Sequence, residues 1–134
     1  MTFYEQKLIR IKALCYSNQG QIDRLILLRK YIRQHFDQKL DLDHLSQIAC
    51  MSKYHLLRIF KHYYGQSIHQ YQISLRIEKA KDLIRQGHKI GETCYAIGFE
   101  SPASFSRLFK DRIGCSPSSF RKAQFSTRFY GDKS

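Results

Sequence analysis

The sequence predicts an all-α fold in which two helix-turn-helix subdomains are joined by a long linker helix. One observation is an internal repeat: an Arg-x-Phe-Lys motif followed by Gly-x-Ser starts at Arg58 and again at Arg107, 49 residues later. Another is that apolar residues recur with the spacing of amphipathic helices, and only two prolines interrupt the 134 residues. A repeated motif indicates one structural unit built twice.

The residues before the first repeat are predicted to form two helices. Residues 3–15 carry apolar side chains on one face and predict an N-terminal helical extension within residues 1–20. Residues 17–20, with the sequence Ser-Asn-Gln-Gly, predict a linker. A second amphipathic helix is then expected over residues 22–36.

The first subdomain, with the linker helix, is expected to span residues 21–86. Its helix-turn-helix consists of a short helix from Leu42 to Ala49, a tight turn at Cys50 and Met51, and a second helix from Lys53 to Tyr64. The predicted caps are Asp41, Ser52 and Gly65. The buried stripe of the second helix is predicted to be Leu56, Ile59, Phe60 and Tyr63. The linker helix follows its own cap, Ser67, and continues to about Gln86.

The second subdomain is expected to span residues 87–123. Its predicted elements are a short helix over 90–97, a turn at 98–100, a second helix over 102–113 that Ser101 caps and Gly114 ends, and a last short helix from Pro117 to about Ala123. Residues 124–134 are expected to form a frayed C-terminal tail.

The charge balance favours a polyanionic partner. Lysine and arginine total 23 against 11 acidic residues, which gives a net charge of +12. Such a charge is typical of proteins that bind DNA, RNA or an anionic membrane surface. The basic residues are spread over the whole chain rather than collected in one tail, so the folded units themselves are expected to carry the binding surface.

The sequence offers little for catalysis or metal binding. No Gly-rich phosphate loop, paired catalytic carboxylates or H-E-x-x-H motif stands out, so we expect no enzyme activity and no cofactor. The four cysteines are widely and irregularly spaced, which predicts reduced, buried thiols in a cytosolic protein rather than a zinc or disulfide site.

Two stretches carry a family resemblance. The first is Gly98-Phe99-Glu100-Ser101 with Phe105, Arg107, Phe109 and Lys110, followed by Gly114-x-Ser116-Pro117; the second is Met51-Ser52 with Leu56, Arg58, Phe60 and Lys61. They resemble the DNA-binding domain of the AraC/XylS family of bacterial transcription regulators, and the resemblance covers about residues 21–123. It implies two recognition helices that enter successive segments of the major groove of double-stranded DNA. Cys50 departs from the family, which often has glycine there, so a positive φ would be costly at this residue.

The resemblance assigns roles on the two recognition helices, about residues 52–64 and 101–113. The expected base-reading residues are Tyr54, Leu57 and Arg58 in the first helix and Ala103, Ser104 and Arg107 in the second. Apart from the resemblance, we expect phosphate contacts from Lys39, Ser52, Lys53, Lys61, Ser101 and Lys110. Arginine can donate two hydrogen bonds to guanine, whereas phosphate contacts set affinity and register without reading sequence.

We therefore expect a sequence-specific transcription regulator, an activator, that binds DNA as a monomer in the bacterial cytoplasm at the nucleoid. RNA polymerase is a further expected partner, and no membrane partner is expected. If Met1 is the true start, the chain is similar to stand-alone, MarA- and SoxS-like members of the family. One alternative is a thiol- or metal-responsive sensor using Cys50, Cys94 and a nearby histidine. The others are the DNA-binding fragment of a larger ligand-responsive AraC-type regulator, and non-specific binding through charge alone.

Overall fold

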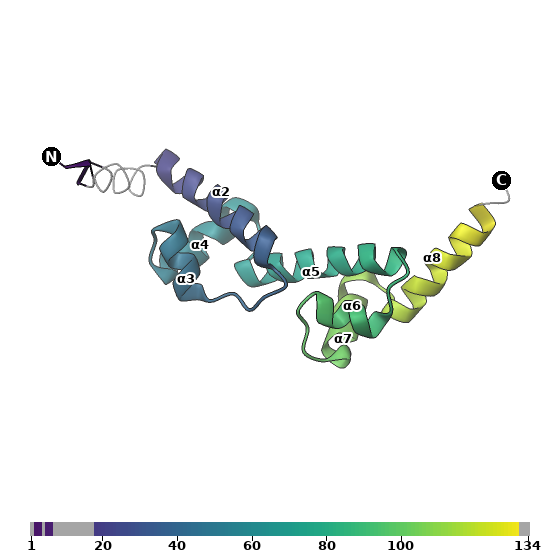
Figure 1. Cartoon of the computed structure of the whole chain (residues 1–134). Coiled ribbons are helices and arrows are strands. Elements are labelled where there is room, and N and C mark those ends of the chain that lie inside the picture. Colours follow the sequence, from purple (N-terminus) through teal and green to yellow (C-terminus); the bar gives the residue numbers. More distant parts are fainter. Residues whose placement is uncertain (1, 4, 7–17, 132–134) are drawn as a thin grey trace. The chain divides into compact units, whose positions relative to one another are not determined.

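The computed structural model describes residues 2–3, 5–6 and 18–131 (Figure 1). The described residues form the helices α2 to α8 and contain no strand, which confirms the all-α prediction. Most of the helix predicted over residues 3–15 lies outside the described residues, as does the end of the tail, residues 132–134. The chain divides into two compact units, Met1–Gln72 and Ile73–Ser134, with the boundary inside α5.

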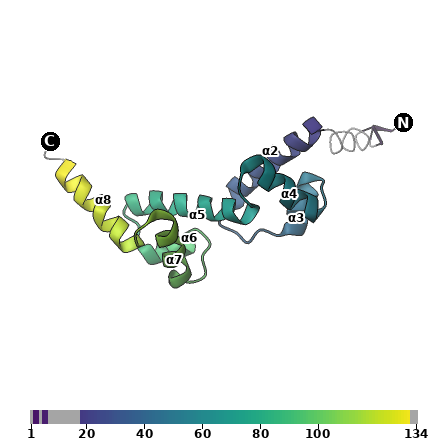
Figure 2. The same ribbon diagram turned by 180° about the vertical axis from the view of Figure 1, so that it is seen from behind.

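The first unit contains α2 (Asn18–His35), α3 (Leu42–Ala49), α4 (Lys53–Tyr64) and the start of α5 (Ile68–Arg85). α2 lies beside α3 and α4 in both Figure 1 and the view from behind (Figure 2). Each helix contributes to the core, which consists of Leu25, Leu28, Ile32, Leu45, Ala49, Leu56, Phe60, Ile68 and Tyr71. This core fixes which face of α4 is turned outward.

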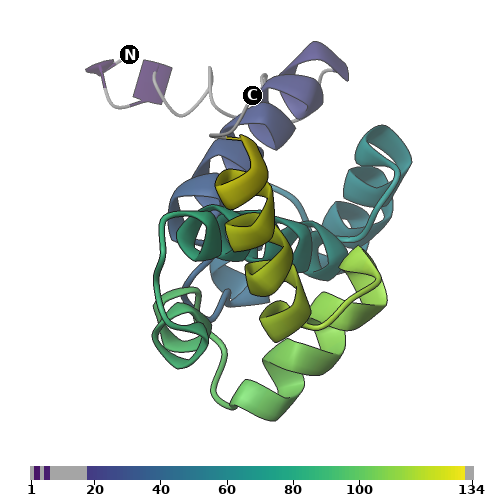
Figure 3. The same cartoon turned by 90° about the vertical axis from the view of Figure 1, so that its right-hand side faces the viewer.

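The second unit contains the rest of α5, α6 (Ile90–Ala96), α7 (Pro102–Ile113) and α8 (Pro117–Gly131). Figure 3 shows α7 connected to α8 through a tight turn. The core is rich in aromatic rings: Phe105 lies 5.5 Å from Phe99 and 5.7 Å from Phe109 between ring centroids, and Phe109 lies 5.5 Å from Phe120. Phe60 is fully buried, which confirms its predicted place in the core, and Phe109 at the matching position of the repeat is fully buried as well.

The predicted caps form as expected. Ser52 Oγ accepts a hydrogen bond from His55 N at 3.2 Å, and Ser101 Oγ accepts one from Ser104 N at 3.1 Å. Ser67 and Gln70 form a reciprocal capping box, in which each side chain accepts from the other's backbone N–H. Such caps contribute about 0.5–2 kcal/mol each, so the start of each recognition helix is fixed locally by one serine.

Three expectations about helix ends and faces are wrong. Asn18 to Gly20 belong to α2 rather than to a linker, because a single glycine costs a helix only about 1 kcal/mol relative to alanine. Gly20 is also buried. Tyr63 is half exposed rather than part of the buried stripe. α8 continues to Gly131, beyond the end expected near Ala123, and no proline or glycine interrupts it before that residue.

Candidate nucleic-acid interface

α4 turns a polar and basic stripe away from the core. Leu56 and Phe60 are buried, whereas Arg58 and Lys61 are exposed and Tyr54 is 87% exposed. Residues three and four apart lie on the same face of a helix. Tyr54, Arg58 and Lys61 therefore project together from one side of α4.

α7 repeats this arrangement. Phe105 and Phe109 are buried, and Ala103, Arg107 and Lys110 are exposed. These three exposed residues follow Tyr54, Arg58 and Lys61 at the offset of 49. Both recognition helices thus present an arginine and a lysine at matching positions of an outward face, and they differ where Ala103 replaces a large aromatic side chain.

Leu57 lies at the side of the α4 stripe rather than at its centre. It is 41% exposed and lines a small hollow of about 160 Å³. The other lining residues are Leu40, Leu42, Leu45, Ile68, His69 and Gln72. Gln72 stabilises this side of the unit, because its Nε2 donates to the backbone oxygens of Phe36 at 3.1 Å and of Gln38 at 2.8 Å.

The repeat pairs Leu57 with Ser106, a half-buried residue that the sequence analysis did not include. It pairs Ser104 instead with His55, whose Nε2 lies 3.4 Å from Nε2 of Gln21 on α2. Position-by-position use of the 49-residue offset would have found both residues. Ser106 and His55 are therefore further candidates for contacts at the edges of the two stripes.

The candidate phosphate contacts differ in exposure and in whether their polar groups already have hydrogen-bond partners within the protein. Lys39, Lys61 and Lys110 are exposed. The hydroxyls of Ser52 and Ser101 already accept cap hydrogen bonds, and Ser101 Oγ also donates to Ser104 Oγ at 3.2 Å.

Lys53, the first residue of α4, is paired with an acidic neighbour. Its Nζ forms an ion pair with Oδ1 of Asp43 on α3. The hydrogen bond to Asp43, together with the charge of that carboxylate, raises the pKa of Lys53. Lys53 is therefore a charged residue with a partner inside the protein, which its sequence position did not reveal.

The turns before the two recognition helices share one backbone geometry. Cys50 N donates to Gln47 O at 3.2 Å and Met51 N donates to Ser46 O at 3.1 Å. Gly98 and Phe99 make the same pair of hydrogen bonds, each at 3.1 Å, with Tyr95 and Cys94. This is the Schellman arrangement, which requires a left-handed residue after the helix.

The left-handed residue is Cys50 in the first turn, with φ of 53°, and Gly98 in the second, with φ of 93°. Cys50 is the only residue other than glycine with positive φ in the described part of the chain. Cys50 thus adopts the positive φ that the sequence analysis considered costly, and it places a Cβ where glycine would be unstrained.

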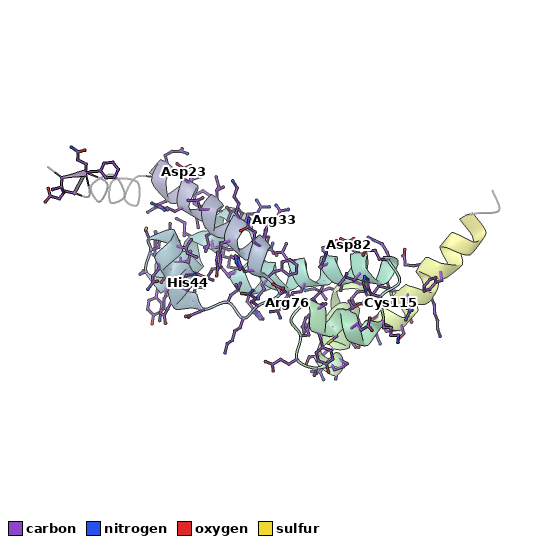
Figure 4. All side chains as sticks on the ribbon, in the orientation of Figure 1. Asp23, Arg33, His44, Arg76, Asp82 and Cys115 are labelled. Atoms are coloured by element: carbon purple, nitrogen blue, oxygen red, sulfur yellow. The ribbon has the colours of Figure 1, made fainter. Side chains whose placement is uncertain are left out.

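The second turn is also held by a side chain from α5. Arg76, labelled in Figure 4, donates from Nη1 to Gly98 O at 3.3 Å, and its guanidinium lies 5.4 Å from the centroid of the Phe99 ring. One α5 residue therefore contacts both the left-handed glycine and the aromatic residue after it, which positions the chain entering α7.

The cysteines show different environments. Cys94 is fully buried, and burial raises the pKa of its thiol, which disfavours the reactive thiolate. Cys50, in the other unit, is exposed and Cys115 is half-buried, so the prediction of buried thiols holds for Cys94 and is wrong for these two. Cys15 lies outside the described residues. No group of three or more metal-binding side chains is found among the described residues. The helices of that same part of the chain include none with the length and apolar character needed to cross a bilayer.

Comparison with known proteins identifies the family. Residues 45–123 match the family described as a helix-turn-helix domain, of the AraC type. The chain belongs to the AraC family. Among curated relatives, a probable transcriptional regulator, LumQ of Photobacterium leiognathi, is 30% identical over 113 residues, which cover 82% of this chain and 46% of that protein. The bifunctional transcriptional activator/DNA repair enzyme AdaA of Bacillus subtilis is 34% identical over 97 residues, which cover 72% of this chain and 46% of AdaA.

Solved structures of this family share the fold. The DNA-binding domain of AdpA, determined in complex with a target DNA, is 26% identical with a TM-score of 0.73, over 78% of this chain and 95% of that one. An AraC-type regulator from Chromobacterium violaceum is 25% identical with a TM-score of 0.71, over 80% of this chain and 96% of that one. This AraC-family chain therefore corresponds to nearly the whole of these solved chains, but to less than half of the curated relatives named above.

Proposed function

We propose that this chain is the DNA-binding part of a sequence-specific transcription regulator, which inserts α4 and α7 into successive segments of the major groove. The observation that carries this proposal is the exposed stripe that occurs twice, Tyr54-Arg58-Lys61 and Ala103-Arg107-Lys110, on helices whose opposite faces are buried. The AdpA domain, which has the same fold, was solved with a target DNA. The net charge of +12 supports a polyanionic ligand.

The roles of individual side chains follow from their chemistry. Arg58 and Arg107 can each donate two hydrogen bonds to O6 and N7 of a guanine, which discriminates by about 1–3 kcal/mol. Tyr54 can pack against a base or sugar. Leu57 and Ala103 can contact only a thymine methyl, and Ser104 can hydrogen-bond a base edge. Lys39, Lys61 and Lys110, with the helix-start serines Ser52 and Ser101, serve as phosphate contacts.

We further propose that one chain occupies an asymmetric site of about two DNA turns as a monomer, because both recognition helices belong to one chain. RNA polymerase is the partner that an activating role would require. We propose that the protein acts in the cytoplasm at the nucleoid. We propose no catalytic role for these residues, since the family that they match is a DNA-binding one.

Binding-site selection followed by competition tests the proposal. Duplexes are selected from a random pool, and a labelled selected duplex is then displaced with either itself or a scrambled duplex of the same composition. Specific regulators bind their sites roughly 10³-fold or more tightly than unrelated DNA. We expect a ratio in that range and one chain per site in a stoichiometric titration. Equal competition by both duplexes would mean binding through charge alone, and two chains per minimal site would contradict monomeric binding.

A further inference from the structure

The first helix-turn-helix contains an ion pair that spans its two helices. Asp43 lies in the first turn of α3, and Lys53 is the first residue of α4. Their charged groups are in contact although the two residues lie ten positions apart in the sequence. The Lys53 side chain is 49% exposed and that of Asp43 is 63% exposed, so both groups remain accessible to a ligand.

Asp43 is itself held in place by the helix that carries it. Its backbone N–H donates to Oδ1 of Asp41, the N-cap of α3, at 3.0 Å. A carboxylate in the first turn of a helix is also favoured by the helix dipole. The cap therefore fixes the backbone from which the Asp43 carboxylate reaches Lys53 at the start of α4.

The second helix-turn-helix has no equivalent of this pair. The left-handed residues Cys50 and Gly98 lie 48 positions apart, so the first helices of the two units align at an offset of 48 and Asp43 matches Gly91. Lys53, after the turn, matches Pro102 at the offset of 49, and neither Gly91 nor Pro102 carries a charge. The N-cap positions differ in the same direction, because Asp41 of α3 corresponds to Lys89 of α6. Glu92 lies in the first turn of α6 and Glu100 precedes the N-cap of α7, but neither forms an ion pair with a described residue.

We propose that the ion pair with Asp43 keeps Lys53 from binding a DNA phosphate. Asp43 thereby limits the sequence-independent affinity of the first unit for DNA, which depends on phosphate contacts. A phosphate can recruit Lys53 only by replacing one anionic partner with another, and the exchange leaves an unpaired carboxylate near the DNA backbone. The gain from such an exchange is small, whereas a lysine without a partner releases counterions fully when it meets a phosphate. Lys53 then counts less toward DNA affinity than Lys61, which lies on the exposed stripe of the same helix.

The inference rests on the proposed DNA binding, and a double-mutant cycle tests it separately. The four proteins are the full chain, Asp43→Asn, Lys53→Ala and the double variant, each titrated against a fluorescein-labelled scrambled duplex over a range of KCl concentrations. Asparagine keeps the shape of Asp43 and removes its charge. Glu92→Gln is the matched control: it removes one exposed acidic charge from the first turn of α6, where no ion pair with a described residue forms. Far-UV circular dichroism verifies that each variant retains its helices.

We expect Asp43→Asn to steepen the slope of log K against log salt by about 0.9, the value for one additional phosphate contact. Affinity for the scrambled duplex should rise by about two- to fivefold, the range expected for releasing an exposed ion pair. Lys53→Ala should change the slope little in the natural background, and should lower it by about 0.9 in the Asp43→Asn background. The selected base sequence should not change.

Two outcomes would overturn the inference. One is that Lys53→Ala lowers the slope by about 0.9 in both backgrounds, which would show that Lys53 leaves Asp43 freely. The other is that Asp43→Asn and Glu92→Gln have the same effect, which would reduce the role of Asp43 to its net charge. If the chain does not bind DNA sequence-specifically, its affinities for the selected and scrambled duplexes will be equal. The double-mutant cycle still tests the role of Asp43 in that case, because it uses only the scrambled duplex.

Discussion

The two helix-turn-helix units share the turn geometry and a buried phenylalanine, Phe60 or Phe109, and they differ in the side chains that face outward. Cys50 and Gly98 occupy equivalent left-handed positions in identical hydrogen-bond patterns. Tyr54 and Ala103 occupy equivalent positions on the exposed stripes. The first unit therefore has the larger reading surface and the more strained turn, whereas the second has an unstrained turn and fewer groups that can reach a base.

The first helices of the two units, α3 and α6, differ in how well they are capped. The second unit has the poorer cap, although the first unit has the more strained turn. The α3 N-cap, Asp41, accepts a hydrogen bond from Asp43 N, whereas the α6 N-cap, Lys89, makes no side-chain cap hydrogen bond. α6 also contains Gly91, which weakens a helix by about 1 kcal/mol relative to alanine. Packing compensates, because Thr93 and Cys94 are buried and Thr93 Oγ1 donates to Lys89 O at 2.8 Å. The two units thus differ in the caps of their supporting helices, and α6 depends more on buried side chains than on a cap.

The largest expected effect tests the shared core. Phe60→Ala and Phe109→Ala each remove a fully buried ring, and each should lower the free energy of unfolding by about 3–5 kcal/mol. Urea denaturation followed by circular dichroism measures both. The exposed Tyr54→Ala serves as the control and should change stability by less than about 0.5 kcal/mol. A small loss for only one phenylalanine would break the equivalence of the two units.

Next in size is the effect of the two arginines on base recognition. Arg58→Ala and Arg107→Ala should each relax preference at one or two base pairs, in different half-sites, by about 1–3 kcal/mol per position. Competition with single-base variants of the selected duplex measures this loss. An unchanged base preference after Arg58→Ala would remove its assigned role.

The turns should respond with opposite signs. Cys50→Gly should stabilise the protein by about 1 kcal/mol, because glycine adopts positive φ without the Cβ clash. Gly98→Ala should destabilise it by about 1–2 kcal/mol for the same reason. Urea unfolding in the presence of a reductant checks both variants. Loss of stability in Cys50→Gly would mean that the cysteine side chain contributes more than its backbone conformation costs.

The smallest expected effects concern the repeated lysines. Lys61→Ala and Lys110→Ala should weaken binding to all duplexes alike, and each should reduce the slope of log K against log salt by about 0.9. Salt titrations with selected and scrambled duplexes measure both quantities. A change in base preference in either variant would reassign that lysine to base reading.

Local chemistry explains which parts of this structure could be predicted from sequence. The serine caps and the glycines that end α4 and α7 depend on residues within a few positions, so they were correctly predicted. The exposure of Tyr63 and the inclusion of Gly20 in α2 depend on tertiary packing, so they were not.

The candidate site follows the same division. The 49-residue repeat predicted the outward faces of Arg58 and Arg107, because helical periodicity and the buried phenylalanines fix them. The partner of Lys53 required knowledge of how α3 packs on α4, since no motif connects Asp43 with Lys53. The assigned contacts with DNA stay predictions.

The central claim is that the two units contribute unequally to base recognition. Binding-site selection at base resolution tests it most directly, with the full chain and with the variants Arg58→Ala and Arg107→Ala. The two variants assign each half-site to its unit through the base pairs that lose preference. The account predicts that information content is concentrated in the half-site contacted by α4, where Tyr54 and Arg58 project, and is lower in the half-site contacted by α7. Equal or greater information in the α7 half-site would contradict it.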